Sequence, residues 1–169
     1  LIIKYKIESI GFDSSLNDKT LKSLIQIDSF NKLKYFRVSN LQKFDFSSCV
    51  NYFKQLVVIS LTFCNLDINN VLKALESNQI NNLQQLDLSG NISESHNNLK
   101  YSISSKLNNL HVNNVRWEVN SLKYFIDTCS NSNLISLSIN NIEFIDSIKS
   151  KDYWKFLLSN LPDQMNTIC

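Results

Sequence analysis

The sequence lacks several features that would point directly to a function. Charged residues make up only 19% and the net charge is +2, which argues against acidic or basic tails and against nucleic-acid binding driven by bulk charge. No run reaches about 18 apolar residues, so no membrane insertion is expected. Residues 1–10 contain no signal-peptide core. A Gly-rich phosphate loop is missing too, and with it a common sign of nucleotide binding.

Glycine and proline are scarce, whereas Asn and Ser are abundant. The 169 residues include 2 Gly and 1 Pro, against 24 Asn and 24 Ser. Hydrophobic residues make up 43%, enough to bury the core of one domain or of part of a larger one. The polar residues alternate with regular apolar positions, which excludes a disordered polar tract. Two explanations remain open: codon bias from an A+T-rich genome, or Asn side chains that hydrogen-bond tight turns.

The four cysteines do not form a recognisable metal or redox motif. No pair among Cys49, Cys64, Cys129 and Cys169 has C-x-x-C spacing. Cys64 and Cys129 fall at positions expected to be buried, where a free thiol packs as a small apolar side chain. We therefore expect reduced thiols and a cytoplasmic or nuclear protein. The single sequon at Asn91 is close to what chance gives in a chain rich in Asn and Ser.

A repeated pattern of apolar residues predicts the architecture. Segments of the form Leu-x-x-Leu-x-Leu include LVVISLTFC from Leu56 and LQQLDLSGN from Leu83. The copies start at Ile2, Leu33, Leu56, Leu83, Leu107 and Leu134. In a short strand the side chains alternate, so positions four and six of each copy should point inward and positions three, five and seven outward. Such a period indicates stacked units, each of which buries its core only against its neighbours.

The segments between the copies should return the chain to the next strand. The stretch from Leu41 also fits the pattern, but it would leave only 15 residues before Leu56, too few for a strand and its return. We therefore predict a return helix over Phe44–Phe53. Helical spacing predicts further returns from two apolar sets. These sets are Leu66, Val71, Leu72 and Leu75, and Leu122, Phe125, Ile126 and Cys129. Position eleven is apolar at Phe12, Leu66, Trp117 and Phe144.

The pattern resembles the leucine-rich repeat family, whose motif L-x-x-L-x-L-x-x-N/C-x-L is matched well by residues 56–66 and partly by 83–91. Repeat lengths near 27, helical returns and Cys64 at position nine are most similar to the ribonuclease-inhibitor-like class. The resemblance implies an α/β solenoid, or horseshoe, of about six repeats with a parallel sheet on the concave face and helices on the convex face. It also implies an intracellular protein. An Asn at position nine usually bonds the turn backbone; only Asn91 supplies one here, so the other turns must be satisfied differently.

We expect repeats over residues 1–145 and a helical return or cap over 146–169. An apolar helix is predicted over 153–161, ending near Pro162. It would either cap the last strand or belong to the middle of a longer solenoid. Trp117 and Trp154 are expected in the core.

No constellation of residues predicts chemistry. His111 should face outward at position five, His96 lies in a polar loop, and neither has a triad spacing to Asp or Cys. We therefore expect no enzyme, no metal and no cofactor. The function predicted is a protein-interaction scaffold that binds its partner on the concave face, with Tyr35 and Arg37 as hot-spot types. The candidate contact residues are Lys4, Lys6, Tyr35, Arg37, Ser60, Gln85, Asp87, Asn109, His111 and Ser138.

Two other functions remain open at this point. A structural subunit of a larger assembly would explain the absence of a polar N-terminal cap and the apolar helix near the C-terminus. A secreted or surface receptor fragment would fit the even number of cysteines and the sequon. Basic residues at Lys4, Lys6, Lys34 and Arg37 are predicted to gather on the first two strands, too sparsely to make phosphate or lipid binding the main role.

Overall fold

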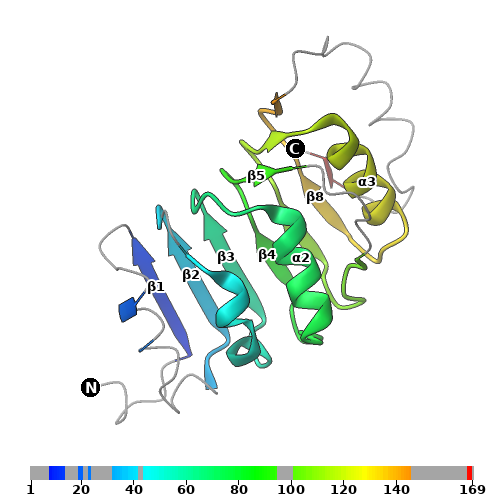
Figure 1. Cartoon of the computed structure of the whole chain (residues 1–169). Coiled ribbons are helices and arrows are strands. Elements are labelled where there is room, and N and C mark those ends of the chain that lie inside the picture. The colour runs from blue at the N-terminus through cyan, green and yellow to red at the C-terminus, as the bar shows by residue number, and fades with distance from the viewer. Residues whose placement is uncertain are drawn as a thin grey trace.

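The computed structural model describes residues 8–13, 19–20, 23, 32–41, 44–94, 101–145 and 167–168. Within them the chain forms a mixed α/β structure with a main parallel sheet of seven strands and a second parallel sheet of three short strands (Figure 1). Two α-helices and two 3-10 helices connect strands within the same ranges. The predicted parallel sheet and the mixed α/β class are therefore confirmed.

The strands of the main sheet follow one another in chain order. They are β1 (Ser9–Asp13), β2 (Tyr35–Ser39), β3 (Val58–Thr62), β4 (Gln85–Asp87), β6 (Asn109–His111), β8 (Ser136–Ser138) and β10 (Thr167–Ile168). Equivalent positions of the sequence pattern lie side by side, since Phe36 pairs with Ile59, and Ile59 with Leu86. The register predicted from Leu33 to Leu134 is thus the register of the sheet.

The second sheet lies where each unit leaves the main sheet. Its strands are β5 (Ile92–Ser93), β7 (Arg116–Trp117) and β9 (Glu143–Phe144). Asp67 continues it as an isolated parallel bridge to Ile92. Trp117 at position eleven is fully buried and its ring lies 4.9 Å from that of Phe125. The expectation that Trp117 belongs to the core is confirmed, whereas Trp154 lies outside the described residues.

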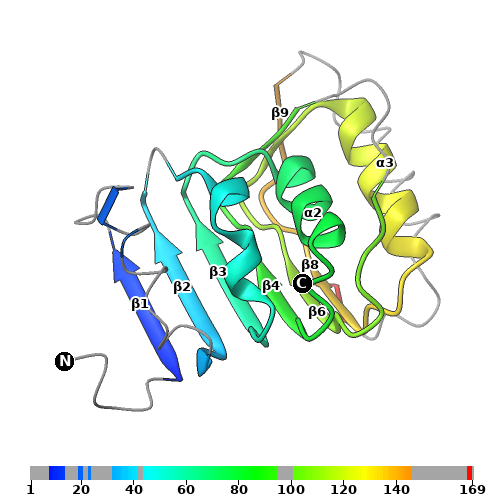
Figure 2. The same cartoon turned by 60° about the horizontal axis from the view of Figure 1, so that its bottom comes forward.

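Helices cover one face of the main sheet, as Figure 2 shows for α2 (Ile68–Ser77) and α3 (Val119–Ser130). The Asp67 carboxylate caps α2 by accepting a hydrogen bond from the backbone N–H of Asn69 at 3.0 Å. The return predicted over Phe44–Phe53 is helical but consists of two short 3-10 segments, η2 (Phe46–Ser48) and η3 (Val50–Phe53). The short interval from Leu33 to Leu56 leaves less room for a return than the longer intervals that contain α2 and α3.

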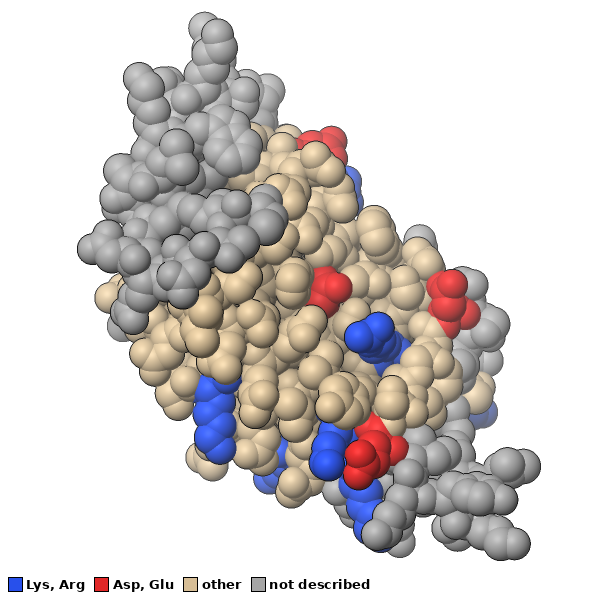
Figure 3. Space-filling view, turned by 180° about the vertical axis from the view of Figure 1, so that it is seen from behind, with Lys and Arg blue, Asp and Glu red and all other residues tan. Residues whose placement is uncertain are grey.

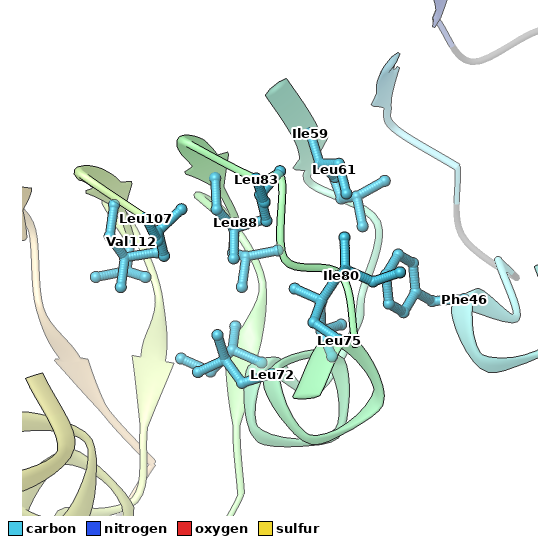
Figure 4. Packing of buried hydrophobic residues seen from close by; sticks show 14 of the residues in the cluster. Phe46, Ile59, Leu61, Leu72, Leu75, Ile80, Leu83, Leu88, Leu107 and Val112 are labelled. Carbon is cyan, nitrogen blue, oxygen red and sulfur yellow. The ribbon is translucent and has the colours of Figure 1, made fainter. Parts of the chain in front are cut away.

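The core lies between the sheet and its helices. Every inward position from β2 to β8 is buried, and the position-four side chains are fully buried. In Figure 4 Leu83 and Leu88, which lie just before and just after β4, fill the space toward Leu72 and Leu75 of α2. Each such side chain removed from water contributes about 1.5–3 kcal/mol. The four apolar residues predicted for the α3 return, and Val71, Leu72 and Leu75 of α2, are buried as expected.

The first repeat is the main error of the sequence analysis. The strand beside β2 is Ser9–Asp13, with Ile10 opposite Phe36 and Phe12 opposite Val38. The apolar pair Tyr5 and Ile7 has the same spacing as Ile10 and Phe12, so the pattern alone did not choose between them. A start at Ile7 makes the first interval 26 residues instead of 31, closer to the others. Phe12 is therefore a strand residue whose ring packs edge-on against Phe36 at 6.5 Å, and its assignment to position eleven is wrong.

The far end of the chain adds one more strand. The helix predicted over 153–161 lies outside the described residues. Beyond it, Thr167 pairs with Ser136 and Ile168 with Leu137, so that β10 extends the main sheet with the same parallel direction.

Candidate protein-binding surface

The face of the main sheet opposite α2 and α3, here called the open face, is built from positions three and five of each strand. Position three contributes Ser9, Tyr35, Val58, Gln85, Asn109 and Ser136. Position five contributes Gly11, Arg37, Ser60, Asp87, His111 and Ser138. Figure 3, seen from behind relative to Figure 1, shows that charged side chains are sparse on this side of the molecule.

Most of the predicted contact residues share this face. Tyr35 and Arg37 are exposed, and five more are partly exposed. These five are Ser60, Gln85, Asp87, Asn109 and His111. Ser138 is an exception, because only 8% of it is exposed and its hydroxyl donates to Asn113 Oδ1 at 2.9 Å. A contact role for Ser138 is therefore not supported.

The described residues of the open face do not include the predicted basic cluster. Lys4 and Lys6 lie outside the described residues, and the strand beside β2 presents Ser9 and Gly11 where these lysines were expected. Lys34 makes an ion pair with Glu8, with 3.3 Å between Nζ and Oε1. Among the described residues, Arg37 is therefore the one basic side chain of this end of the open face without an acidic partner, and a single cation does not favour phosphate or lipid.

A row of left-handed residues ends the strands and forms the rim of the open face. Position eight has a φ between 53° and 73° in each unit from β2 to β8. The rim residues are Asn40, Phe63, Gly90, Asn114 and Asn141. Each of the first four donates its backbone N–H to the position-seven carbonyl of the next unit, at 2.8–3.0 Å. Asn tolerates this conformation better than most residues. Part of the Asn content therefore serves the turns at position eight, whereas the sequence analysis expected it at position nine.

Phe63 is the unusual member of the rim. A bulky aromatic residue at a φ of 54° is strained, and 49% of Phe63 is exposed. Its ring lies over Gly90, where a Cβ atom would be only 2.3 Å from the nearest ring carbon. The absence of a side chain at Gly90 therefore makes the position of the Phe63 ring possible. Nothing in the repeat pattern singled out either residue.

Position nine holds the turns together from inside. Asn91 is 1% exposed; its Nδ2 donates to the carbonyls of Leu61 and Leu88 at 2.6 and 2.8 Å. Its Oδ1 accepts from the backbone N–H groups of Cys64 and Leu66 at 3.1 and 3.0 Å. The prediction that this Asn bonds the turn backbone is confirmed. An Asn so buried and fully bonded is not accessible to glycosylation in the folded chain.

Cys64 occupies the same position one unit earlier and makes a related contact. Its Sγ lies 3.7 Å from the carbonyl oxygen of Val38, the residue equivalent to Leu61, and 3.2 Å from that of Thr62. A thiol thus replaces the amide as donor, which is one way in which a turn without Asn is satisfied.

The described cysteines are free and buried. Cys49, Cys64 and Cys129 form no disulfide, and Cys169 lies outside the described residues. Burial raises the pKa of the Cys129 and Cys64 thiols above the ordinary value, and a backbone hydrogen bond at Leu41 partly offsets this for Cys64. Protonated, water-shielded thiols are poor nucleophiles and poor metal ligands.

A buried polar network joins elements on the helical side. The side chain of Asn69 on α2 donates to the hydroxyls of Ser121 on α3 and Ser93 on β5, at 2.7 and 3.0 Å. Its Oδ1 accepts from the Tyr101 hydroxyl at 3.0 Å, and burial raises the pKa of that phenol well above its usual range. Every bond links residues at least 24 positions apart, so the network serves to fix α2 and α3 relative to each other.

The remaining features of the described residues concern metal binding, membrane spans and cavities. In the ranges that the structure describes, no three His, Cys, Asp or Glu side chains approach closely enough to hold a metal ion. Nor does this part of the chain contain a helix of the length and apolarity needed to cross a membrane. A groove of about 430 Å³ between η2 and α2 and a small apolar cavity of about 80 Å³ beneath Ile103 lie on the helical side. The lining of the second includes core leucines such as Leu72 and Leu83.

Comparison with known proteins gives no relative from which a function can be transferred. No family model, no curated protein and no solved structure matches the chain. The function is therefore inferred from the side chains of the open face and from the way the sheet presents them.

Proposed function

We propose that this chain is a non-catalytic leucine-rich repeat module that binds a protein partner on the open face of its main sheet. The observation that carries the proposal is that buried and exposed side chains alternate along each strand. Positions four and six are buried throughout β2 to β8, while positions three and five present a surface that no described helix covers. The motif resemblance and the horseshoe of about six repeats belong to this proposal.

The equivalent roles of Asn91 and Cys64 support the repeat interpretation. Both lie at position nine, and both contact the position-six carbonyl of the preceding unit, at Leu61 and Val38 respectively. A motif in which Asn and Cys alternate at one position makes physical sense if both side chains donate to that carbonyl. Residues 56–91 thus behave as consecutive units of one repeating structure.

The character of the open face supports protein recognition. Tyr35 is 40% exposed and sits beside Val58 across the sheet, while Arg37 follows on the same strand. Tyr and Arg are enriched among residues that dominate binding energy at protein interfaces. The rest of the face is polar and nearly neutral, which suits a protein better than a polyanion or a lipid surface.

We infer a reducing compartment, either cytoplasm or nucleus, and an adaptor or regulator as the kind of protein. The support is the burial of Cys49, Cys64 and Cys129 as free thiols at separate places in the core. The sequon does not support the receptor alternative, because its Asn91 is buried. A structural subunit remains the second candidate, and the following experiment separates it from the first.

The test is affinity purification of the tagged chain from its own cells beside a variant carrying Tyr35→Ala, Arg37→Glu, Asp87→Lys and His111→Ala. The matched control carries Lys73→Glu and Asp127→Lys, equal and opposite charge changes at exposed positions of α2 and α3. The proposal expects a defined partner with the wild type and the control and its loss with the open-face variant. Recovery of one large complex with all three proteins would place binding elsewhere and favour the structural subunit.

A further inference from the structure

The open face carries two opposite charges at a fixed separation. Arg37 and Asp87 are both at position five, on β2 and β4, with Ser60 of β3 between them. Neighbouring strands lie about 4.8 Å apart, so the backbones at these two positions are about 10 Å apart. No ion pair joins the two side chains within the described residues.

Both groups have unused bonding capacity. Among the described residues the exposed Arg37 guanidinium has neither a hydrogen bond nor an ion pair. Asp87 uses Oδ1 to accept from the backbone N–H of Ser89 at 3.0 Å, which fixes the carboxylate. Its second oxygen has no partner among the same residues, and His111 stands opposite on β6 without a side-chain hydrogen bond there. An approaching ligand therefore meets one free donor group and one free acceptor group.

The surface beside this charge pair is apolar. Tyr35 and Val58 adjoin at position three, one step along the strands from Arg37 and Ser60. An apolar side chain placed there would be flanked by the guanidinium. An interface centre of this kind, an aromatic anchor beside a charged group, is the usual location of high binding energy.

We propose that the open face binds a protein segment that crosses the strands and carries a carboxylate over Arg37 and a cationic side chain over Asp87, about 10 Å apart, with an apolar side chain against Tyr35 and Val58. This inference rests on the proposed function and specifies the partner's chemistry. In a helix the two charges stand seven residues apart, at 1.5 Å per residue. In a polyproline II segment, which has three residues per turn and a rise of about 3.1 Å, they stand three apart. A polyanion such as nucleic acid would satisfy Arg37 but meet repulsion at Asp87.

The probe is a phage-displayed library of random 20-residue peptides, selected separately on the whole chain and on single charge reversals. Wild-type selection should enrich peptides with one acidic and one basic residue at three- or seven-residue spacing. Selection on Arg37→Glu should replace the acidic residue by a basic one, and selection on Asp87→Lys should replace the basic residue by an acidic one. Each reversal should weaken a wild-type-selected peptide by about tenfold. Lys73→Glu and Asp127→Lys, tested singly, should leave both selection and affinity unchanged.

A further variant, Ser60→Trp, separates failure of this inference from failure of the proposed function. If enriched peptides lose binding to Ser60→Trp but show no charge preference, the open face binds protein and the charge-pair inference is wrong. Should they bind Ser60→Trp as well as wild type, binding lies elsewhere and both ideas fail. No enrichment at all counts against the inference, whereas the proposed function is still decided by purification from cells. Circular dichroism of each variant confirms that it is folded before selection.

Discussion

Replacing Asn91 by Ala should be among the most damaging single changes on the described part of the chain. The side chain makes four short bonds, two donated to Leu61 and Leu88 and two accepted from Cys64 and Leu66. At about 1 kcal/mol of net stability per buried hydrogen bond, the loss is about 4 kcal/mol. Domains of this size have a total stability of about 5–15 kcal/mol, so a large fraction of it would be removed.

The measurement is urea denaturation followed by tryptophan fluorescence, to which the buried Trp117 contributes, with thermal unfolding as a second readout. A loss of about 4 kcal/mol lowers the midpoint temperature by about 8–16 °C for a chain of this length. Asn91→Cys should lose about half as much, because a thiol restores a donor toward Leu61, as Cys64 does toward Val38, but supplies no comparable acceptor.

The control is Asn120→Ala, at an exposed position of α3 where the Asn side chain makes no hydrogen bond to the described residues. It should change stability by less than about 0.5 kcal/mol. The reasoning is refuted if Asn91→Ala costs no more than this control, or if Asn91→Cys is as damaging as Asn91→Ala. The first result would mean that the turns do not depend on the position-nine side chain, and the second that a thiol cannot replace the amide at this position.

Three more predictions concern the rim and the buried thiols. Gly90→Ala should destabilise the chain by about 1–3 kcal/mol, because the added Cβ meets the Phe63 ring and φ is +73°. The midpoint of urea unfolding measures this loss, and adding Phe63→Asn to the Gly90→Ala variant should restore most of it. Phe63→Asn alone should stabilise by about 1 kcal/mol by relieving left-handed strain; an unchanged midpoint would contradict the strain argument. Burial raises the pKa of Cys129 in the folded state, so its contribution to the free energy of unfolding is complete below the ordinary thiol pKa of 9.0 and declines by about 1.4 kcal/mol per pH unit above it. Cys129→Ala should therefore flatten the dependence of the free energy of unfolding on pH above pH 9, and an unchanged slope would contradict the assignment.

Much of the fold could be predicted because burial alternates with a simple period. From Leu33 onward, each inward position carries an apolar residue, and a one-residue slip would have turned every such side chain toward water. The helical sets of α2 and α3 were visible for the same reason. The first unit was misplaced because Tyr5–Ile7 and Ile10–Phe12 satisfy the period equally. The choice depended on the packing of Phe12 against Phe36, a contact 24 residues away.

The open face was only partly predictable, because exposure depends on neighbours from other units. Ser138 has the same position as Ser60, yet Asn113 binds its hydroxyl and it is nearly buried. Asn69 is a polar residue on the buried side of α2. Its partners Ser93 and Ser121 are 24 and 52 residues away, so no local pattern could have indicated that an Asn is satisfied there.

The scarcity of glycine and the abundance of Asn are both related to the left-handed residues of the rim. Five successive units need a left-handed residue at position eight, and the chain meets this need with three Asn, one Phe and one Gly. Glycine is therefore not required for the turn itself. It is required at Gly90 because the ring of Phe63 occupies the space where a side chain would be. Strain at Phe63 and the missing side chain at Gly90 thus form one coupled feature. Because Phe63 is 49% exposed and is the only large apolar residue in the described rim, it is the rim residue best placed to extend an interface beyond the open face.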